Sequence, residues 1–536
     1  MLQLRPMSVV NVFGGGARRL GGREIAVWTF VAFAQFLLWT VSVQQHLSND
    51  SYQYLSVAEN LRAGHGIETS LVHFDVERAH GTIPTPITTF PSGFPMAAAA
   101  LGRLGLPPTA AAIGVSLLSM ALAVALLALA CNALELGVWV SRGVILLFAV
   151  NAYVLWYAGS VSSEPLFTLL FLASVTAALE AENAESERRL ALLALASGAC
   201  AGAPYWVRYA GLLVIAGLGV ALGTLFLVRR TRRALQTLLL TMMAAVVPVA
   251  FGFARNLRLT GTWQGGNTKV VTHPLVEMVK KSVTAVGHLF VGEALTPPAR
   301  VCEGLFVLAL GFALVRWRRW PRGQAGARAF IVAAVTGVYC VLMFYVGLHS
   351  VISYAARMFL PALPLLLLAF ASTIEPPPRT ALASRIFALA GFAAYALCGP
   401  LNFGLAAPPS GHVTVATRLA LPAADGQPLA AWIDGHIGPH EPIMAADGQA
   451  TGHLLRRPTV SLVGVEYSEL VWNEAAIEQA MDRFGIRYLI LYKQASGGEQ
   501  DSPFLMSLVG GATDAHLRLA ARNDESLIFE RVRAGG

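Results

Sequence analysis

Eleven long apolar runs constrain this chain more than any other feature of its sequence. A run of roughly 20 apolar residues can cross the hydrocarbon core of a membrane as a helix. The runs fall at residues 25–44, 109–131, 138–157, 165–181, 190–206, 209–228, 235–254, 301–315, 329–347, 358–374 and 384–402. Arg142 and Asn151 interrupt the third run, and Gly198, Gly202 and Pro204 crowd the end of the fifth. We therefore predict a polytopic α-helical membrane protein with about 11 transmembrane helices.

The composition agrees with this prediction. Only 13% of the 536 residues are charged and 55% are hydrophobic, whereas soluble proteins carry roughly 25% charged residues. This balance excludes an ordinary soluble enzyme, and the high apolar content excludes a disordered or fibrous chain.

The short loops between the runs place their arginines on one side of the membrane. Cytoplasmic loops of membrane proteins are enriched in Lys and Arg. With a cytoplasmic N-terminus, the cytoplasmic segments contain Arg18, Arg19, Arg23, Arg188, Arg189, Arg229, Arg230, Arg232, Arg233, Arg316, Arg318, Arg319, Arg322, Arg379 and Arg385. An odd number of spans then places the C-terminus on the extracytoplasmic side. The net charge of +8 is largely a record of topology, and we expect no nucleic-acid partner.

Three segments on the outer side are long enough to fold. Two are loops, at 45–108 and 255–300, within a transmembrane domain of residues 1–402. The third is the tail, 403–536, in which helical patterns at 430–437 and 473–484 alternate with strand patterns at 442–446, 459–463 and 487–492. This alternation predicts a small extracytoplasmic α/β domain. Because it has no phosphate loop or nucleophile motif, we expect it to assist rather than to catalyse.

The first outer loop begins with a helical pattern. Leu55, Ala58 and Leu61 recur at helical spacing, and Gly64 can end the helix, so we predict a short amphipathic helix along the membrane surface. Asp50 stands at its start, where it either caps the helix or serves a function. Further along, residues 90–95 (FPSGFP) lead into a short apolar stretch at 97–101, which predicts a turn back into the interface.

A second carboxylate, Glu164, opens the fourth apolar run and is followed by Pro165. The helix dipole favours an acidic residue at this position whatever its function. Alternatively, Asp50 and Glu164 point into one cavity, where paired carboxylates bind a divalent metal or supply a general base.

Basic residues on the outer side form a third group. Arg357 lies at the outer end of the tenth run, where it either snorkels to lipid headgroups or binds a phosphate at the membrane surface. Arg208, Lys269, Lys280 and Lys281 are weaker candidates of the same kind, for which a solvated surface position is the simpler interpretation.

The order of these motifs resembles a known enzyme superfamily. The motifs are DSYQY at 50–54, AENL at 58–61, GHG at 64–66, FPSGFP at 90–95, SEPL at 163–166, RYAG at 208–211 and RMFLPALP at 357–364, with AWI at 431–433 and FGIRYLI at 484–490 in the tail. Together they resemble the GT-C superfamily of integral-membrane glycosyltransferases, which includes protein O-mannosyltransferases, the aminoarabinose transferases that act on lipid A, and many bacterial relatives.

The resemblance implies an enzyme of the bacterial plasma (inner) membrane. It would move a sugar from a polyprenyl-phosphate carrier to a glycan, lipid or protein acceptor on the outer side, and the superfamily implies inversion at the anomeric carbon. Asp50 occupies the place of the essential acidic residue of the family's first loop, which suits a general base. Arg357 is the leading partner for the lipid phosphate, followed by Lys269 and Arg208, and Glu164 is a second catalytic candidate, through a metal or acceptor orientation.

Other residues of the first loop are candidate substrate contacts: Tyr54, Asp75, Glu77 and His80. Asn49 precedes Asp50, whereas protein mannosyltransferases often carry adjacent acidic residues at this point. No ligand spacing decides whether a metal is bound, with Asp50 and Glu164 as the residues available for one. The alternatives from other classes are a lipid or sugar transporter or flippase, and a scaffold that presents the outer domain; no internal repeat of the kind typical of transporters is visible.

Overall fold

The computed structural model describes residues 19–43, 47–74, 76–266, 271–291, 324–349, 355–374, 414–423, 426–462, 471–493, 502–512 and 514–532. The predicted spans 301–315 and 384–402 lie outside these residues, as do two candidate site residues, Asp75 and Lys269.

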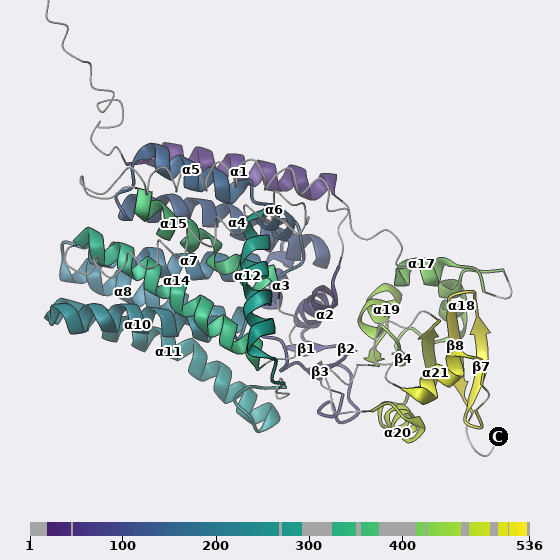
Figure 1. Cartoon of the computed structure of the whole chain (residues 1–536). Coiled ribbons are helices and arrows are strands. Elements are labelled where there is room, and N and C mark those ends of the chain that lie inside the picture. Colours follow the sequence, from purple (N-terminus) through teal and green to yellow (C-terminus); the bar gives the residue numbers. More distant parts are fainter. Residues whose placement is uncertain are drawn as a thin grey trace, which may run out of the picture.

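A helical bundle makes up most of the molecule (Figure 1). Within the described residues, seven helical segments are long and apolar enough to cross a membrane, or eight if one bent pair is a single span. The seven are α1 (Gly22–Ser42), α4 (Pro108–Ala133), α7 (Glu164–Glu182), α8 (Glu187–Gly202) continued by α9 (Pro204–Val207), α10 (Gly211–Arg229), α11 (Arg232–Thr260) and α14 (Gln324–Leu348). The tenth predicted run forms two short 3₁₀ turns, η3 (Ala356–Met358) and η4 (Leu360–Ala362), followed by the apolar helix α15 (Leu363–Ile374).

The bent pair corresponds to the third predicted run. Helix α5 (Val138–Ala149) and helix α6 (Ala152–Ala158) meet at an angle of 57°. Asn151 sits at the break and caps α6, because its side-chain oxygen accepts hydrogen bonds from the backbone N–H groups of Tyr153 and Val154 at 2.9 and 3.2 Å. Its amide nitrogen donates to the carbonyl of Leu289 at 2.8 Å. The polar residue that interrupts the apolar pattern therefore marks a real break in the helix.

The glycines of the fifth predicted run allow two helices to approach closely. A Cβ atom on Gly198 would lie 2.1 Å from the carbonyl oxygen of Thr241, and one on Gly202 would lie 2.4 Å from that of Ala245. Both carbonyls belong to α11, so α8 and α11 pack through a small-residue seam of the kind common between membrane helices.

The first outer loop forms α2 (Asn49–Ala63), three two-residue strands, β1 (Glu68–Thr69), β2 (Leu71–Val72) and β3 (Thr85–Pro86), and α3 (Gly93–Gly102). The helix expected along the membrane surface is thus present as α2, but protein rather than an open surface surrounds most of it: Tyr54, Leu55, Val57 and Ala58 are buried. Helix α2 packs against α3 on one side and against α19 (Gly448–Leu455) on the other. It therefore joins the bundle to the C-terminal part of the chain (Figure 1).

The C-terminal part is built on a six-stranded sheet in the order β2-β5-β4-β6-β8-β7. Its strands β4 (Ile443–Ala445), β5 (Thr459–Ser461) and β6 (Tyr488–Tyr492) are parallel, whereas β8 (Ser526–Arg531) runs antiparallel to both β6 and β7 (Leu517–Arg522). The remaining helices of this part are α17 (Val415–Ala420), α18 (Leu429–His436), α20 (Glu474–Phe484) and α21 (Pro503–Val509). The edge strand β2 comes from the first outer loop and pairs in parallel with β5, Leu71 opposite Thr459.

Helix α12 (Leu275–Val291) completes the described part of the bundle. It packs against α14 and against η3, the turn that contains Arg357. The second outer segment therefore contributes a helix beside the predicted phosphate-binding arginine.

Candidate functional site

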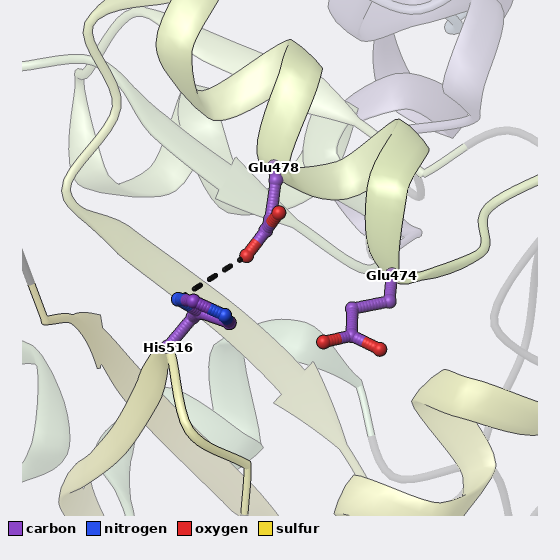
Figure 2. Close-up of side chains that lie close together, drawn as sticks. All are labelled: Glu474, Glu478 and His516. Atoms are coloured by element: carbon purple, nitrogen blue, oxygen red, sulfur yellow. Dashed lines mark ion pairs between the residues drawn. The ribbon is translucent and has the colours of Figure 1, made fainter. Parts of the chain in front are cut away.

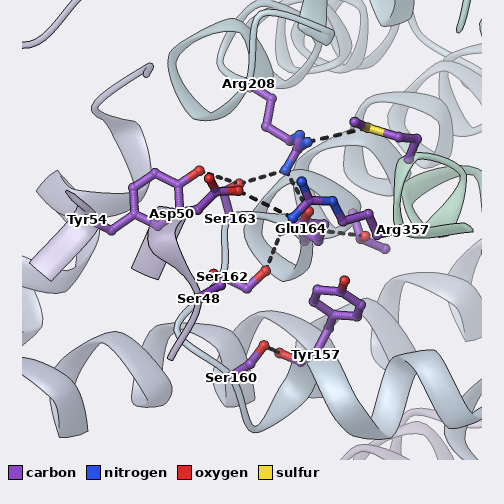
Figure 3. A network of polar contacts seen from close by, with 12 residues as sticks. Ser48, Asp50, Tyr54, Tyr157, Ser160, Ser162, Ser163, Glu164, Arg208 and Arg357 are labelled. Atoms are coloured by element: carbon purple, nitrogen blue, oxygen red, sulfur yellow. Dashed lines mark hydrogen bonds and ion pairs between the residues drawn. The ribbon is translucent and has the colours of Figure 1, made fainter. Parts of the chain in front are cut away.

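Four charged side chains from four separate segments meet at one end of the bundle (Figure 3). Asp50 lies in the first turn of α2, and Glu164 is the first residue of α7. Arg208 follows α9, and Arg357 lies in η3. The sequence singled out all four, and the fold brings them into one network.

The carboxylates and guanidinium groups form two ion pairs of different exposure. Glu164 Oε1 lies 2.7 Å from Arg208 Nη1, and the two side chains are 4% and 19% exposed. Asp50 Oδ2 lies 3.3 Å from Arg357 Nη1, and these side chains are 28% and 29% exposed. The first pair is therefore enclosed by protein, whereas the second is open enough to meet a substrate.

Neighbouring polar groups hold the enclosed pair in place. Ser162 donates a short hydrogen bond to the other oxygen of Glu164. Arg208 also donates to Ser163 Oγ at 3.0 Å and to Met358 Sδ at 3.6 Å. Because Met358 adjoins Arg357, these contacts connect the start of α7 to the turn that carries the second arginine.

Helix α2 is fixed so that the carboxylate of Asp50 is left for the site. Ser48, not Asp50, caps the helix, with Ser51 completing a capping box. Ser51 also donates to the carbonyl of Val161 at 2.8 Å, and Tyr54 donates its hydroxyl hydrogen to Ser163 Oγ at 3.1 Å. The helix cap is therefore Ser48 and not Asp50. Two hydrogen bonds connect α2 to the segment that leads into α7.

Both arginines remain charged in this setting. Burial alone would lower the pKa of Arg208, but the carboxylates of Glu164 and Asp50 outweigh it and raise the pKa above its usual value. The same balance raises the pKa of Arg357. The site therefore offers a permanent positive charge to an anionic group.

Three residues near the network were not among the sequence-based candidates: Ser162, Ser163 and Tyr157. The two serines directly precede Glu164, so their position beside the carboxylate was the available signal. Tyr157 belongs to α6, and its ring faces the charged groups in Figure 3. Only the break at Asn151 turns that part of the span toward the site, and no local pattern shows the direction of such a bend.

The other loop candidates lie elsewhere. Glu77 and His80 are exposed, and Gly81 beside them lies against the end of α20, because a Cβ on Gly81 would be 2.4 Å from the carbonyl oxygen of Arg483. Within the described residues, no contact connects Glu77 or His80 to the four charged groups. Tyr54, by contrast, lies in the network itself.

The carboxylates considered for a metal each have an arginine partner. In the part of the chain that the structure describes, one group of three potential metal ligands lies close together, and it is in the C-terminal part: Glu474, Glu478 and His516 (Figure 2). His516 Nδ1 lies 3.5 Å from Glu478 Oε1, where the side chain of His516 is exposed and that of Glu478 is half-buried. An ordinary surface ion pair accounts for this contact.

The fold has clear counterparts among solved structures. ArnT from Cupriavidus metallidurans matches with a TM-score of 0.59 and 14% sequence identity over 95% of this chain and 98% of its own, and it has also been solved bound to undecaprenyl phosphate. The oligosaccharyltransferase AglB from Archaeoglobus fulgidus, in complex with an inhibitory peptide and a dolichol-phosphate, matches with a TM-score of 0.54 and 11% identity over 90% of this chain and 72% of its own. The chain has the GT-C fold. The mycobacterial arabinofuranosyltransferase AftD shares this fold with a TM-score of 0.53 and 17% identity, where 97% of this chain matches 40% of AftD.

The GT-C fold and the apolar helices together identify an integral membrane protein. The resemblance inferred from the motifs is thus confirmed at the level of the fold. The sequence itself matches no protein-family model and no curated protein.

Proposed function

We propose that this protein is a membrane glycosyltransferase that moves a sugar from a polyprenyl-phosphate carrier to an acceptor on the extracytoplasmic side. The observation that carries the proposal is the partly exposed pair of Asp50 and Arg357, a carboxylate and a guanidinium 3.3 Å apart. Transfer of a sugar needs a group of each kind, one to take a proton from the acceptor and one to stabilise the departing phosphate.

The pair suits a single-displacement reaction. The acceptor hydroxyl oxygen forms a bond to the anomeric carbon, and Asp50 takes the proton of that hydroxyl. The bond between the anomeric carbon and the phosphate oxygen breaks, and the electron pair leaves with the polyprenyl phosphate. Arg357 exchanges its contact with Asp50 for one with this phosphate, which leaves the Asp50 carboxylate free to accept the proton. Direct attack of this kind inverts the anomeric carbon.

The enclosed pair has a supporting role in this proposal. Glu164 holds Arg208, and Arg208 contacts both Ser163 and Met358, so the two keep Tyr54 and Arg357 in position. Arg208 also adds positive charge behind the phosphate. Lys269 is retained as a further phosphate ligand, and a divalent metal at Asp50 and Glu164 as the alternative to a metal-free reaction. Asp75, Glu77 and His80 belong to the same outer loop as Asp50 and are retained as contacts to a part of the acceptor that lies away from the reacting hydroxyl.

The membrane arrangement belongs to the same proposal. We infer eleven spans, a cytoplasmic N-terminus, and residues 403–536 outside the plasma membrane of a bacterium. The arginine-rich connections support this orientation. Arg230 lies in the turn between α10 and α11, with Arg229 at the end of α10 and Arg232 and Arg233 at the start of α11. The charged network and the C-terminal sheet then share the outer side.

The proposal is tested by measuring whether the protein releases polyprenyl phosphate from its sugar-loaded form. Lipids are extracted from cells that lack this protein, in which the sugar-loaded polyprenyl phosphate should accumulate. Purified wild-type protein, together with envelope material from the same cells, should convert this lipid to free polyprenyl phosphate, as measured by mass spectrometry. A lipid profile identical to that of the parent strain, with no release on addition of the protein, would contradict the proposed function.

A further inference from the structure

The hydroxyl of Tyr157 distinguishes this residue from the two other tyrosines that the described part of the chain places around the site. Three tyrosine hydroxyls lie around the network, and two are used by the protein: Tyr54 donates to Ser163 at 3.1 Å, and Tyr339 donates to the carbonyl of Met358 at 3.0 Å. Among the described residues, no group forms a hydrogen bond with the hydroxyl of Tyr157, which Figure 3 shows directed toward the charged groups. A half-buried phenol in such a place is available to a ligand.

The electrostatic surroundings define what this ligand can be. Tyr157 lies within reach of the charges of Glu164, Arg357, Arg208 and Asp50. The two carboxylates already have arginine partners, so the position favours a group that accepts a hydrogen bond next to Arg357. A phosphate oxygen is such an acceptor.

The broken span holds Tyr157 in this position. Asn151 caps α6 through Tyr153 and Val154, and it donates to the carbonyl of Leu289 in α12. Helix α12 in turn packs against η3, which carries Arg357. The rings of Tyr153 and Tyr157, one helical turn apart, are stacked with centroids 6.4 Å apart. Tyr157 and Arg357 are therefore positioned by elements that contact one another.

We propose that Tyr157 is a phosphate-binding residue whose hydroxyl donates a hydrogen bond to a non-bridging oxygen of the lipid-linked phosphate held by Arg357. This assignment rests on the proposed function. It adds the neutral hydroxyl of Tyr157 to the charged guanidinium of Arg357 as a second hydrogen-bond donor to the phosphate. The hydrogen bond strengthens as the sugar departs, because negative charge accumulates on the phosphate at that moment. Tyr157 therefore stabilises the leaving group without taking part in proton transfer.

Binding of two lipids that differ only in the phosphate tests the assignment. Undecaprenyl phosphate and undecaprenol are titrated into wild-type protein, Tyr157→Phe and Tyr153→Phe in the same detergent. The Phe variant of Tyr157 keeps the ring and removes one oxygen, so the fold and the apolar contacts persist. We expect it to bind undecaprenyl phosphate about tenfold more weakly, as for a lost hydrogen bond to a charged group, and undecaprenol as the wild type does. Tyr153→Phe should match the wild type with both lipids.

The outcomes separate this assignment from the function on which it rests. If wild-type protein binds undecaprenyl phosphate and undecaprenol equally well, it does not recognise the phosphate, and the proposed function is contradicted. If the wild type does distinguish them and Tyr157→Phe binds undecaprenyl phosphate equally well, the assignment is wrong while the function stands. An equal weakening for both lipids would also overturn it, since that result indicates a change of packing rather than a lost phosphate contact.

Discussion

At the scale of single residues, the two carboxylates of the site differ in what surrounds them. Asp50 has one arginine partner and is 28% exposed, whereas Glu164 is 4% exposed and receives hydrogen bonds from both Arg208 and Ser162. A general base needs a free oxygen within reach of the substrate. Asp50 meets this requirement, and the oxygens of Glu164 are occupied by the protein.

Asp50→Asn should therefore reduce sugar transfer by about 10²- to 10⁴-fold, the usual contribution of a general base. Asparagine keeps the shape of the side chain, and the loss of a partly exposed ion pair costs at most about 1 kcal/mol. The variant should bind undecaprenyl phosphate as the wild type does, and its apparent Tm should barely change. Transfer at the wild-type rate by purified Asp50→Asn protein would refute the assignment.

Glu164→Gln should act on stability instead. It leaves the guanidinium of Arg208, 19% exposed, without its counter-charge, and breaking a buried pair in this way costs about 3–5 kcal/mol. Glu180→Gln is the matched control, because Glu180 pairs with the well-exposed Arg189 at 3.0 Å, and it should cost less than about 1 kcal/mol. Thermal unfolding in detergent measures both variants, and equal Tm values would show that Glu164 is not a structural residue.

At the scale of elements, the least expected feature is a strand shared between distant parts of the chain. Strand β2 of the first loop pairs with β5, and Gln53 of α2 donates to the carbonyl of Leu71 in β2 at 2.8 Å. On the other side, the ring of Tyr52 lies 5.2 Å from that of His453 in α19. The helix that carries Asp50 is thus held by the edge strand β2 of the six-stranded sheet and by α19.

A disulfide across this strand pair tests the arrangement. Leu71 and Thr459 are direct partners on adjacent strands, about 4.8 Å apart, within the range that a disulfide bridges. Mild oxidation of Leu71→Cys/Thr459→Cys should give a crosslinked peptide by mass spectrometry. Leu71→Cys/Ile443→Cys is the control, because Ile443 lies one strand further away, at about 9.6 Å, and should stay unlinked. Equal crosslinking of the two variants would contradict the pairing.

The sequence predicted single elements better than their contacts. The helix expected at 473–484 is α20, with Asn473 as its cap, because an amphipathic period and a capping residue are local signals. Asp50 and Glu164 were likewise recognised from their motifs. The pairing of each carboxylate with its own arginine, the contribution of β2 to a distant sheet and the turn of Tyr157 toward the site depend on tertiary packing, which no window of the sequence contains.

At the scale of the whole molecule, the proposed orientation places both the charged network and the C-terminal part of the chain outside the cytoplasm. Alkaline phosphatase fused after residue 536 should be active in a bacterial host, and green fluorescent protein at the same point should be dark. Fusions after residue 230, in the turn between α10 and α11, should give the opposite pair of results. A fluorescent C-terminal fusion would place the C-terminus in the cytoplasm and contradict the proposed orientation.

Removal of the C-terminal part should separate binding from transfer. Glu164, Arg208 and Arg357 are positioned by α7, α9 and η3 of the bundle, so a chain lacking residues 405–536 should still bind undecaprenyl phosphate. Its α2 loses α19, and its β2 loses β5, so Asp50 is no longer held at the position for proton transfer. We expect transfer to fall at least as far as in Asp50→Asn, with phosphate binding retained.

The comparison with Asp50→Asn makes this result specific. If a monodisperse truncated protein loses both phosphate binding and sugar transfer, the C-terminal part forms some of the phosphate site. If it transfers sugar at the full rate, α2 is held by the bundle alone. If only sugar transfer is lost, the C-terminal sheet fixes the position of Asp50, which lies outside the sheet, through its pairing with strand β2 of the first loop. The C-terminal part then assists catalysis by geometry rather than by supplying a reacting group.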